Sequence, residues 1–221
     1  MEMTPERWSA TERYAAEVFG EADLVLQAIS AAAAAAGLPD IAVSAEEGRL
    51  LMILTSMTPG RLAVEVGALG GYSGTWIARG LAPDGRLITI EIDPRHADVA
   101  EAAFRAAGLD DKVELRRGAA LDVLPGLAKE LGPGSVDVAF IDAHKIEYPD
   151  YFRLLEPLIA PGGLFLADNV YGTGGAWIDQ ADSNPGMAAV DRLNRMVAEH
   201  PDFEAVAVPI RTGLLIARRH H

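Results

Sequence analysis

The sequence predicts an α/β fold built around a mostly parallel sheet. Two observations carry this prediction: five strand–helix units follow one another from residue 61 onward, and their strands are apolar on both faces. A third is a closing pair of strand-like runs near the C-terminus, which fits an antiparallel edge. Connections between parallel strands are right-handed, so the carboxyl ends of the five strands should meet at one edge, where ligands of such sheets bind.

The N-terminal part is predicted to be helical. Residues 7–20 and 21–37 are rich in good helix formers, and Gly37 with Pro39 ends the second segment. A third helix covers residues 44–57, where Ser44 and Glu47 have the spacing of a capping box. We expect residues 1–58 to form the N-terminal helices, and residues 60–221 to form the sheet-containing core of the same single domain, 1–221.

The strands and helices of the core follow from the alternation of apolar runs with turn and capping residues. The predicted strands are 61–67, 86–93, 112–118, 135–142, 162–169, 203–209 and 213–219. The predicted helices are 72–82, one that begins at 94, 121–131, 149–159 and 186–200.

Composition restricts the class of protein. The 221 residues are enough for one domain with a sizeable core, and no apolar run is long enough to span a membrane. The formal net charge of −13 argues against nucleic acid as the main partner. Without cysteine there is neither a disulfide framework nor thiolate chemistry, and the charged start lacks the apolar core of a secretory signal. We therefore expect a cytoplasmic protein.

The turn after the first strand is rich in glycine but does not match a phosphate-binding loop. Residues 65–74 read EVGALGGYSG, and the dinucleotide pattern G-x-G-x-x-G would need glycine where Leu69 stands. Glycines in this turn would let a ligand approach the backbone closely. Glu65 would repel a pyrophosphate and suits a cationic ligand instead.

The ends of the second and third strands complete a nucleoside-binding pattern without phosphate. Glu91 lies where an acid can accept two hydrogen bonds from a ribose diol, and Asp93 is the better cap for the next helix. The small residues 118–120 would let an adenine lie against the chain. A ribose acid beside a loop unsuited to phosphate indicates S-adenosylmethionine, although packing alone explains the small residues equally well.

Polar side chains follow the fourth and fifth strands. Asp142, Asp168 and Asn169 offer three oxygen ligands at neighbouring strand ends, which suits Mg²⁺, with Ca²⁺ or Mn²⁺ as alternatives. The histidines are scattered and cysteine is absent, so zinc is not supported. Lys145 stands three residues after Asp142, and it is either a solvated amine or a group that reaches a substrate oxygen at the metal.

Together these motifs resemble a known family. The segments SAEEGRLL, VEVGALGGYSG, TIEID, RRGAALDVLP, FIDAHKIEYPDYF and GGLFLADNV occur in the order and spacing of the cation-dependent S-adenosylmethionine O-methyltransferases of the caffeoyl-CoA and catechol type. The resemblance runs from about residue 40 to the C-terminus. It implies a Rossmann-like class I methyltransferase fold, with a mostly parallel seven-stranded sheet, helices on both faces and an antiparallel C-terminal strand.

The resemblance also implies roles for individual residues. Asp142, Asp168 and Asn169 match the family's metal ligands, and Lys145 matches its general base, so Lys145 and Asp142 are the expected catalytic residues. The expected cofactor-binding residues are Val43, Glu65, Gly67, Ala68, Tyr72, Ser73, Glu91, Ala120, Asp142 and His144. Family members are commonly homodimers that methylate small phenolic substrates such as vicinal diphenols. The resemblance also implies that the N-terminal helices, residues 1–58, cover the substrate pocket.

Two departures from the family pattern concern the cofactor and the acceptor. His144 stands where plant members usually carry a second acid, and residues 170–177, VYGTGGAW, differ from the plant segment. Tyr171, Thr173 and Trp177 could thus shape a different acceptor pocket. The alternatives are a tRNA methyltransferase of the same branch acting on a modified uridine, a nicotinamide oxidoreductase, which Leu69 disfavours, and a non-catalytic protein that binds S-adenosylmethionine.

Overall fold

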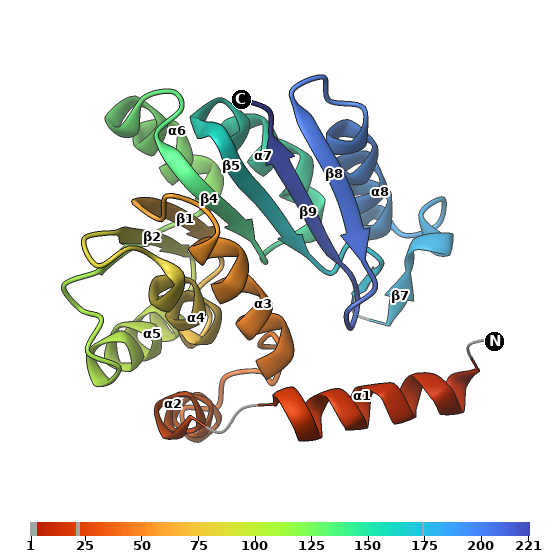
Figure 1. The fold of residues 1–221 in the computed structure, drawn as a ribbon, viewed down its shortest axis with the longest axis horizontal. Coiled ribbons are helices and arrows are strands. Elements are labelled where there is room, and N and C mark those ends of the chain that lie inside the picture. Colours follow the sequence, from red (N-terminus) through yellow and green to blue (C-terminus); the bar gives the residue numbers. More distant parts are fainter. Residues whose placement is uncertain (1–3, 21–22, 174) are drawn as a thin grey trace.

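A seven-stranded sheet with helices on both faces forms the body of the computed structural model (Figure 1). The structure describes residues 4–20, 23–173 and 175–221. The strands of this sheet are β1 Leu62–Val66, β2 Arg86–Glu91, β3 Val113–Arg117, β4 Val136–Ile141, β5 Ile159–Asp168, β8 Phe203–Val208 and β9 Leu214–Arg219. A separate two-stranded ribbon consists of β6 Gly172–Thr173 and β7 Ala176–Trp177.

The strand order of the large sheet is β3-β2-β1-β4-β5-β9-β8. Strands β1 to β5 pair in parallel, whereas β9 runs antiparallel to both β5 and β8. The predicted mostly parallel sheet with an antiparallel C-terminal strand is therefore confirmed. The strand order reverses between β1 and β4, so their carboxyl ends flank the crevice in which such folds bind ligands.

Helices cover the two faces of the sheet in separate groups. In chain order they are α1 Pro5–Phe19, α2 Leu24–Ala35, α3 Ala45–Ser56, α4 Tyr72–Gly80, α5 Pro94–Ala106, α6 Ala120–Leu131, α7 Tyr148–Leu155 and α8 Pro185–Ala198. Apolar side chains of α6, α7 and α8 pack on one face of the sheet. Those of α2, α3, α4 and α5 pack on the other. None of the described helices is both long and apolar enough to cross a membrane.

A buried carboxylate joins the amino ends of the two central strands. Asp137 of β4 is fully buried and accepts hydrogen bonds from the backbone N–H groups of Arg61 and Leu62, at 2.7 and 3.3 Å. The guanidinium of Arg61 lies 3.2 Å from the same carboxylate. These contacts fix the start of β1 beside β4. Because the two strands pair in parallel, the same register determines which residues lie side by side at their carboxyl ends.

The predicted helix over residues 149–159 and the predicted strand over 162–169 differ from the structure. Helix α7 ends at Leu155, and a 3₁₀ turn over Glu156–Leu158 leads directly into β5 at Ile159. Pro157 explains the early end, because proline has no backbone N–H to continue an α-helix. The end of β5 at Asp168, which matters for the site, was predicted to within one residue.

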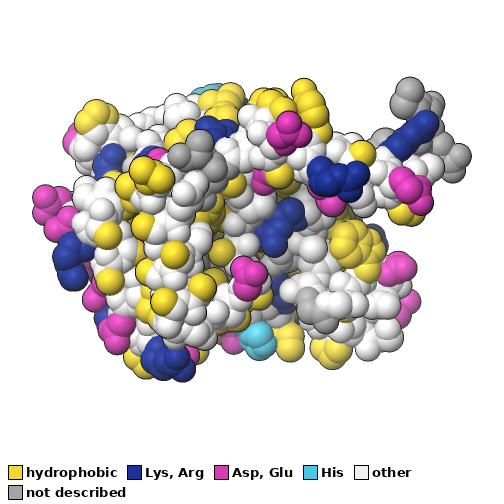
Figure 2. Space-filling model, turned by 90° about the horizontal axis from the view of Figure 1, so that it is seen from below, with side chains coloured by type: hydrophobic (Ala, Val, Ile, Leu, Met, Phe, Trp, Pro, Cys, Tyr) yellow, Lys and Arg dark blue, Asp and Glu magenta, His cyan; other side chains and the backbone are white. Residues whose placement is uncertain are grey.

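Helix α1 packs little against the rest of the chain. It contains no buried residue, and it extends along the lower side of the molecule in Figure 1. Its C-terminal end is held by Arg49 of α3, whose Nε donates to the carbonyl of Phe19 at 3.1 Å. The apolar side chains of Trp8, Tyr14 and Phe19 are exposed. Figure 2, which looks at the molecule from below, shows this helix projecting at one side.

Candidate active site

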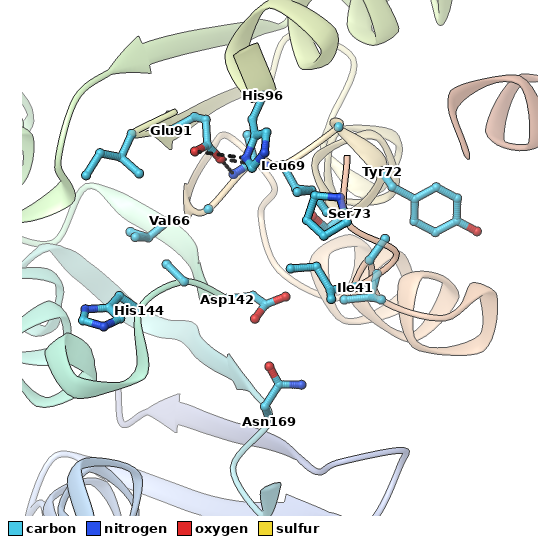
Figure 3. Close-up of a pocket in the computed structure, with 18 of the residues that line it drawn as sticks. Ile41, Val66, Leu69, Tyr72, Ser73, Glu91, His96, Asp142, His144 and Asn169 are labelled. Atoms are coloured by element: carbon cyan, nitrogen blue, oxygen red, sulfur yellow. Dashed lines mark hydrogen bonds and ion pairs between the residues drawn. The ribbon is translucent and has the colours of Figure 1, made fainter. Parts of the chain in front are cut away.

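A cavity of about 1270 Å³ lies along the carboxyl edge of the sheet. Its lining comes from the residues that follow β1, β2, β3, β4 and β5, with one wall from α2 and residues 38–43 (Figure 3). Pockets for single drug-sized ligands usually measure about 300 to 1,000 Å³. The cavity therefore has room for a cofactor and a second molecule. Helix α1 contributes no lining residue, so the N-terminal wall is formed by α2 and the segment after it.

The glycines after β1 bring parts of the protein together. A Cβ atom on Gly67 would lie 2.1 Å from the carbonyl oxygen of Asp142, and Gly67 has a φ of +99°. A Cβ on Gly74 would lie 2.8 Å from the carboxylate of Glu65. The sequence suggested that these glycines make room for a ligand. In the structure they allow the loop to pack against the end of β4 and against a buried acid.

Glu65 does not face the cavity. Its side chain is fully buried behind the loop and accepts hydrogen bonds from the hydroxyls of Ser73 and Thr89, both at 2.6 Å. Burial raises the pKa of Glu65 to about 7, although these two hydrogen bonds act in the opposite direction. The expectation that Glu65 meets a cationic ligand is not met by this arrangement. Its contact with Ser73, which does line the cavity, makes it a support for the loop.

Glu91 lines the cavity, but its carboxylate is not free. One oxygen accepts from the backbone N–H groups of Ala68 and Leu69, at 3.1 and 2.8 Å, and the other accepts from Asp93 at 2.9 Å. His96 approaches the same carboxylate at 3.8 Å, as Figure 3 shows. A carboxylate has about four lone-pair sites, and three N–H groups already use three of them, so one site remains for a hydroxyl group of a ligand. Glu91 thus holds the glycine-rich loop as well as facing the site.

The other predicted cofactor residues lie around the same cavity. Those that line it are Val43, Gly67, Ala68, Tyr72, Ser73, Ala120, Asp142 and His144. In Figure 3 the rings of Tyr72 and His144 point away from Asp142. The His144 side chain is 65% exposed and lies 3.5 Å from Glu147, so it borders the cavity on its solvent-exposed side.

Asp142, Lys145 and Tyr148 form a linked group at the end of β4. The Lys145 Nζ donates to Asp142 Oδ1 at 2.7 Å and also lies against the hydroxyl of Tyr148. Tyr148 is fully buried, which raises its pKa well above the ordinary value, and its hydroxyl donates to the carbonyl of Asp168 at 3.1 Å. The short turn over Lys145–Glu147 brings the amine back over the carboxylate. The chain thus holds a nearly buried amine at the floor of the cavity.

Asp168 and Asn169 lie at the end of the neighbouring strand. Asn169 adopts a left-handed φ of 59°, and its Nδ2 donates to Thr212 Oγ1 at 2.7 Å, which leaves its amide oxygen for another partner. In Figure 3 its side chain faces Asp142 across the cavity. Asp168 is buried beside them, and burial, followed by the charge of Asp142, raises its pKa.

This donor set fits a hard divalent cation. Two carboxylates brought together away from water repel one another, and a cation between them would relieve that repulsion. Within residues 4–20, 23–173 and 175–221, no group of three or more His, Asp or Glu side chains is arranged to hold a metal. A metal at this place would therefore need the amide oxygen of Asn169 in addition to Asp142 and Asp168, a combination typical of Mg²⁺ or Ca²⁺.

The sequence did not identify Glu47 and Arg211 as part of this region. Glu47 was interpreted as half of a capping box, and the backbone half is present, since the Glu47 N–H donates to Ser44 at 3.3 Å. Its buried side chain instead lies 3.4 Å from Arg211 and close to Asp168, and burial followed by Asp168 raises its pKa to about 9. Contacts between residues so far apart in the chain leave no local signal in the sequence.

Two further lining residues were missed on the Glu91 side. Ile92, which is 69% exposed, and His96 of α5 both line the cavity beside Glu91. For Ile92 the sequence held one signal, because an isoleucine that directly follows an acid at the end of a strand is a candidate for a ligand-facing position.

Comparison with known proteins identifies the family. Residues 16–220 match the family model described as O-methyltransferase. A catechol O-methyltransferase of Niastella koreensis is 37% identical over 203 residues, covering 92% of this chain and 91% of that protein. A catechol O-methyltransferase of Mycobacterium tuberculosis is 40% identical over 186 residues, covering 84% and 82%. The crystal structure of a Bacillus cereus O-methyltransferase in complex with SAH superposes with a TM-score of 0.88 at 34% identity, covering 97% and 99%.

The seven-stranded, mostly parallel sheet and the superposition on this enzyme show a Rossmann-like methyltransferase fold. The chain belongs to the O-methyltransferase family, and it is a class I S-adenosylmethionine-dependent O-methyltransferase of the caffeoyl-CoA and catechol type. The family resemblance and the expected enzyme class are thereby confirmed. The roles assigned to individual residues stay predictions.

The burial of Glu65 predicts a pH-dependent stability. Its folded pKa of about 7 exceeds the ordinary glutamate value of 4.5, so between these pH values the folded chain binds a proton that the unfolded chain has lost. This contribution is fully present below about pH 4.5 and is lost as the pH rises through about 7. Glu65→Gln removes the titration. The stability of the variant relative to the wild type should therefore increase with pH, by at most ~1.4 kcal/mol per pH unit.

Urea unfolding of both proteins at a series of pH values between about 5 and 8 measures this difference. Glu204→Gln, on the exposed edge strand β8, is the control and should show no such trend. A stability difference between Glu65→Gln and the wild type that stays constant with pH would contradict the prediction.

Proposed function

We propose that the enzyme transfers the methyl group of S-adenosylmethionine to one hydroxyl of a vicinal diphenol, with the help of a divalent cation. The arrangement of Asp142, Asn169 and Lys145 carries this proposal. Two hard oxygen donors face each other across the cavity, and an amine lies 2.7 Å from one of them. The catechol O-methyltransferase names of two relatives support the same acceptor class.

The cofactor would occupy the side of the cavity formed by the loop after β1 and by Glu91. Glu91 accepts a hydrogen bond from one ribose hydroxyl, and Ser73, held by Glu65, faces the amino-acid end of the cofactor together with Val43. Ala120 and the other small residues after β3 leave space for the adenine. Because the loop is already fixed by backbone hydrogen bonds to Glu91, little ordering of the chain is needed on binding.

Asp142, Asp168 and Asn169 would hold the cation, which is Mg²⁺ in our proposal. When bound, it would supply the positive charge that lowers the pKa of the acceptor hydroxyl. The chain orients the acceptor so that this hydroxyl oxygen lies in line with the sulfonium methyl group, and such alignment contributes much of the rate.

Lys145 acts on the hydroxyl proton. A neutral amine at Nζ takes the proton while the oxygen's electron pair forms the new bond to the methyl carbon. The bond between methyl carbon and sulfur breaks, and its electron pair stays on sulfur, which leaves S-adenosylhomocysteine. Tyr148, kept protonated by burial, fixes Nζ above Asp142 throughout.

Removal of the cation provides the main test. Excess EDTA should lower the turnover of catechol by on the order of 100-fold, because the acceptor loses its charge stabilisation and its orientation. The Kd for S-adenosylmethionine, measured by calorimetry, should change little, since the cofactor contacts come from other residues.

Added Mg²⁺ should restore turnover in the wild type, and Asn169→Ala should need a higher Mg²⁺ concentration. Asp150→Ala, at an exposed ion pair on α7, is the control. Full turnover in EDTA would refute the metal role.

Substitution of Lys145 separates proton transfer from charge. Lys145→Met should lower kcat on the order of 100-fold or more while the cofactor Kd is retained. Lys145→Arg keeps the positive charge but cannot accept a proton near neutral pH, so it should be as slow as Lys145→Met. If the arginine variant recovers most of the rate, the amine acts through its charge and the assignment as general base is wrong.

We further propose a homodimer formed through α1. This helix buries none of its residues in its own chain and exposes Trp8, Tyr14, Val18 and Phe19. Exposed aromatic side chains along one helix fit a protein interface. We take a second copy of this chain as the partner, because it is present wherever the protein is made.

A chain that begins at residue 21 tests this proposal, because α1 has no buried residue and its removal should leave the core intact. Light scattering after size-exclusion chromatography should show a dimer for the full chain and a monomer for the shortened chain, with unchanged circular dichroism of the remaining fold. A monomeric full chain, or a shortened chain that stays dimeric, would contradict the role of α1.

The cytoplasmic location stays a prediction, supported by the absence of cysteine. A tRNA acceptor is not favoured by any feature of the site, and the net charge of −13 opposes it.

A further inference from the structure

Arg211 stands at an unusual position in the turn between β8 and β9. Its φ is 46°, a left-handed conformation that costs a residue with a Cβ atom of the order of 1 kcal/mol. Glycine would fit this backbone without strain. The hydrogen bonds of the turn hold the backbone in this conformation. An arginine therefore occupies a position for which the backbone conformation alone would favour glycine.

The turn is fixed to the metal-binding end of the site. Backbone N–H groups of Val170 and Tyr171 donate to the carbonyls of Gly213 and Thr212, at 3.0 and 2.8 Å. The hydroxyl of Thr212 accepts from Asn169, so the residue after Arg211 holds a predicted metal ligand. On its other side the guanidinium reaches the carbonyl of Ala42, at 3.1 Å. Arg211 therefore spans the acceptor end of the cavity, which it lines.

Most of the guanidinium remains available for a ligand. Only Nη1 makes contacts, to Ala42 and, at the long distance of 3.4 Å, to Glu47. In the part of the chain that the structure describes, Nε and Nη2 have no hydrogen-bond partner, and the side chain is 39% exposed. Neutralising Glu47 is the alternative role of Arg211. That role uses one nitrogen at a long distance and leaves the rest of the planar group facing the cavity.

Arg211 is also the available cation of the cavity. Among the described lining residues, Lys145 and Arg211 are the only lysine and arginine. Lys145 is only 11% exposed and is committed to Asp142 and Tyr148. Figure 2, which faces the carboxyl edge of the sheet, shows Lys and Arg side chains near the middle of this face. An anionic group on a bound molecule would thus find its counter-charge at Arg211.

We propose that Arg211 binds a carboxylate carried by the acceptor, so that the preferred acceptors are vicinal diphenols with a carboxylate on the ring or on a short side chain. This inference rests on the proposed function. The planar guanidinium can form two parallel hydrogen bonds with a carboxylate, which suits recognition of one end of a rigid ring. The methionine carboxylate of the cofactor is the other possible source. The hydrogen bond of Thr212 to Asn169 favours the acceptor, because it ties Arg211 to the metal end instead of to Ser73.

The test compares 3,4-dihydroxybenzoate with 3,4-dihydroxybenzamide, which differ in charge and little in shape. The wild type should have the higher kcat/KM for the benzoate. Arg211→Met, which keeps side-chain length and the same backbone demand, should reduce this preference at least tenfold, mainly through the KM of the benzoate. Arg211→Lys should retain part of the preference. Arg86→Met, exposed at the opposite edge of the sheet, is the control and should keep the wild-type preference.

Equilibrium binding separates this inference from the proposed function. Calorimetry with Mg²⁺ and saturating S-adenosylhomocysteine should show tighter binding of the benzoate than of the amide, and Arg211→Met should abolish the difference. If the wild type methylates neither compound, the proposed function fails, and the binding difference still decides the role of Arg211. Equal preference in wild type and Arg211→Met overturns the inference. So does a rise of the cofactor Kd in Arg211→Met without a change in benzoate preference, which would assign Arg211 to the methionine carboxylate.

Discussion

The close approach of the carboxyl ends of β1 and β4 determines the rest of the site. Gly67 lies so near the carbonyl of Asp142 that any side chain there would clash, and the Asp142 N–H donates to Val66 at 2.9 Å. The loop after β1 and the group that contains Lys145 are therefore parts of one packed unit. At the opposite ends of the same two strands, Asp137 joins β4 to the start of β1. The position of the glycine-rich loop after β1 relative to Nζ of Lys145 is thus set by strand pairing in the middle of the sheet.

Buried acids support the surface of the site from behind. Glu65 positions Ser73, and Glu91 holds the N–H groups of Ala68 and Leu69. At the end of β5, Glu47 lies beside Asp168 and Arg211. Removing a buried carboxylate that is hydrogen-bonded in this way leaves its donors unsatisfied, so these residues matter for geometry even where they do not touch a ligand.

The sequence predicted the sheet and the ends of its strands well. The spacing of apolar residues, the glycines of the turns and the capping residues all lie within a few positions of the element that they define. Asp142, Asp168 and Asn169 could be placed at one edge for the same reason. The direction of a side chain could not be predicted: Glu65 turns inward because Ser73 and Thr89 meet it there, and Glu47 turns away from its own helix start. Arg211 carries no local signal at all, since its importance depends on a left-handed turn beside a strand more than forty residues earlier.

The hairpin of β8 and β9 has a consequence for how such enzymes diversify. It closes the sheet on the side away from β3, and its turn is hydrogen-bonded to the residues after β5, while the glycine-rich loop follows β1 and is fixed by Glu91 of β2. Under the proposed function, the two reactants would contact separate stretches of the chain on either side of the β1–β4 junction. Acceptor preference would then change through substitutions in one terminal turn, while the methyl donor would continue to meet an unchanged surface.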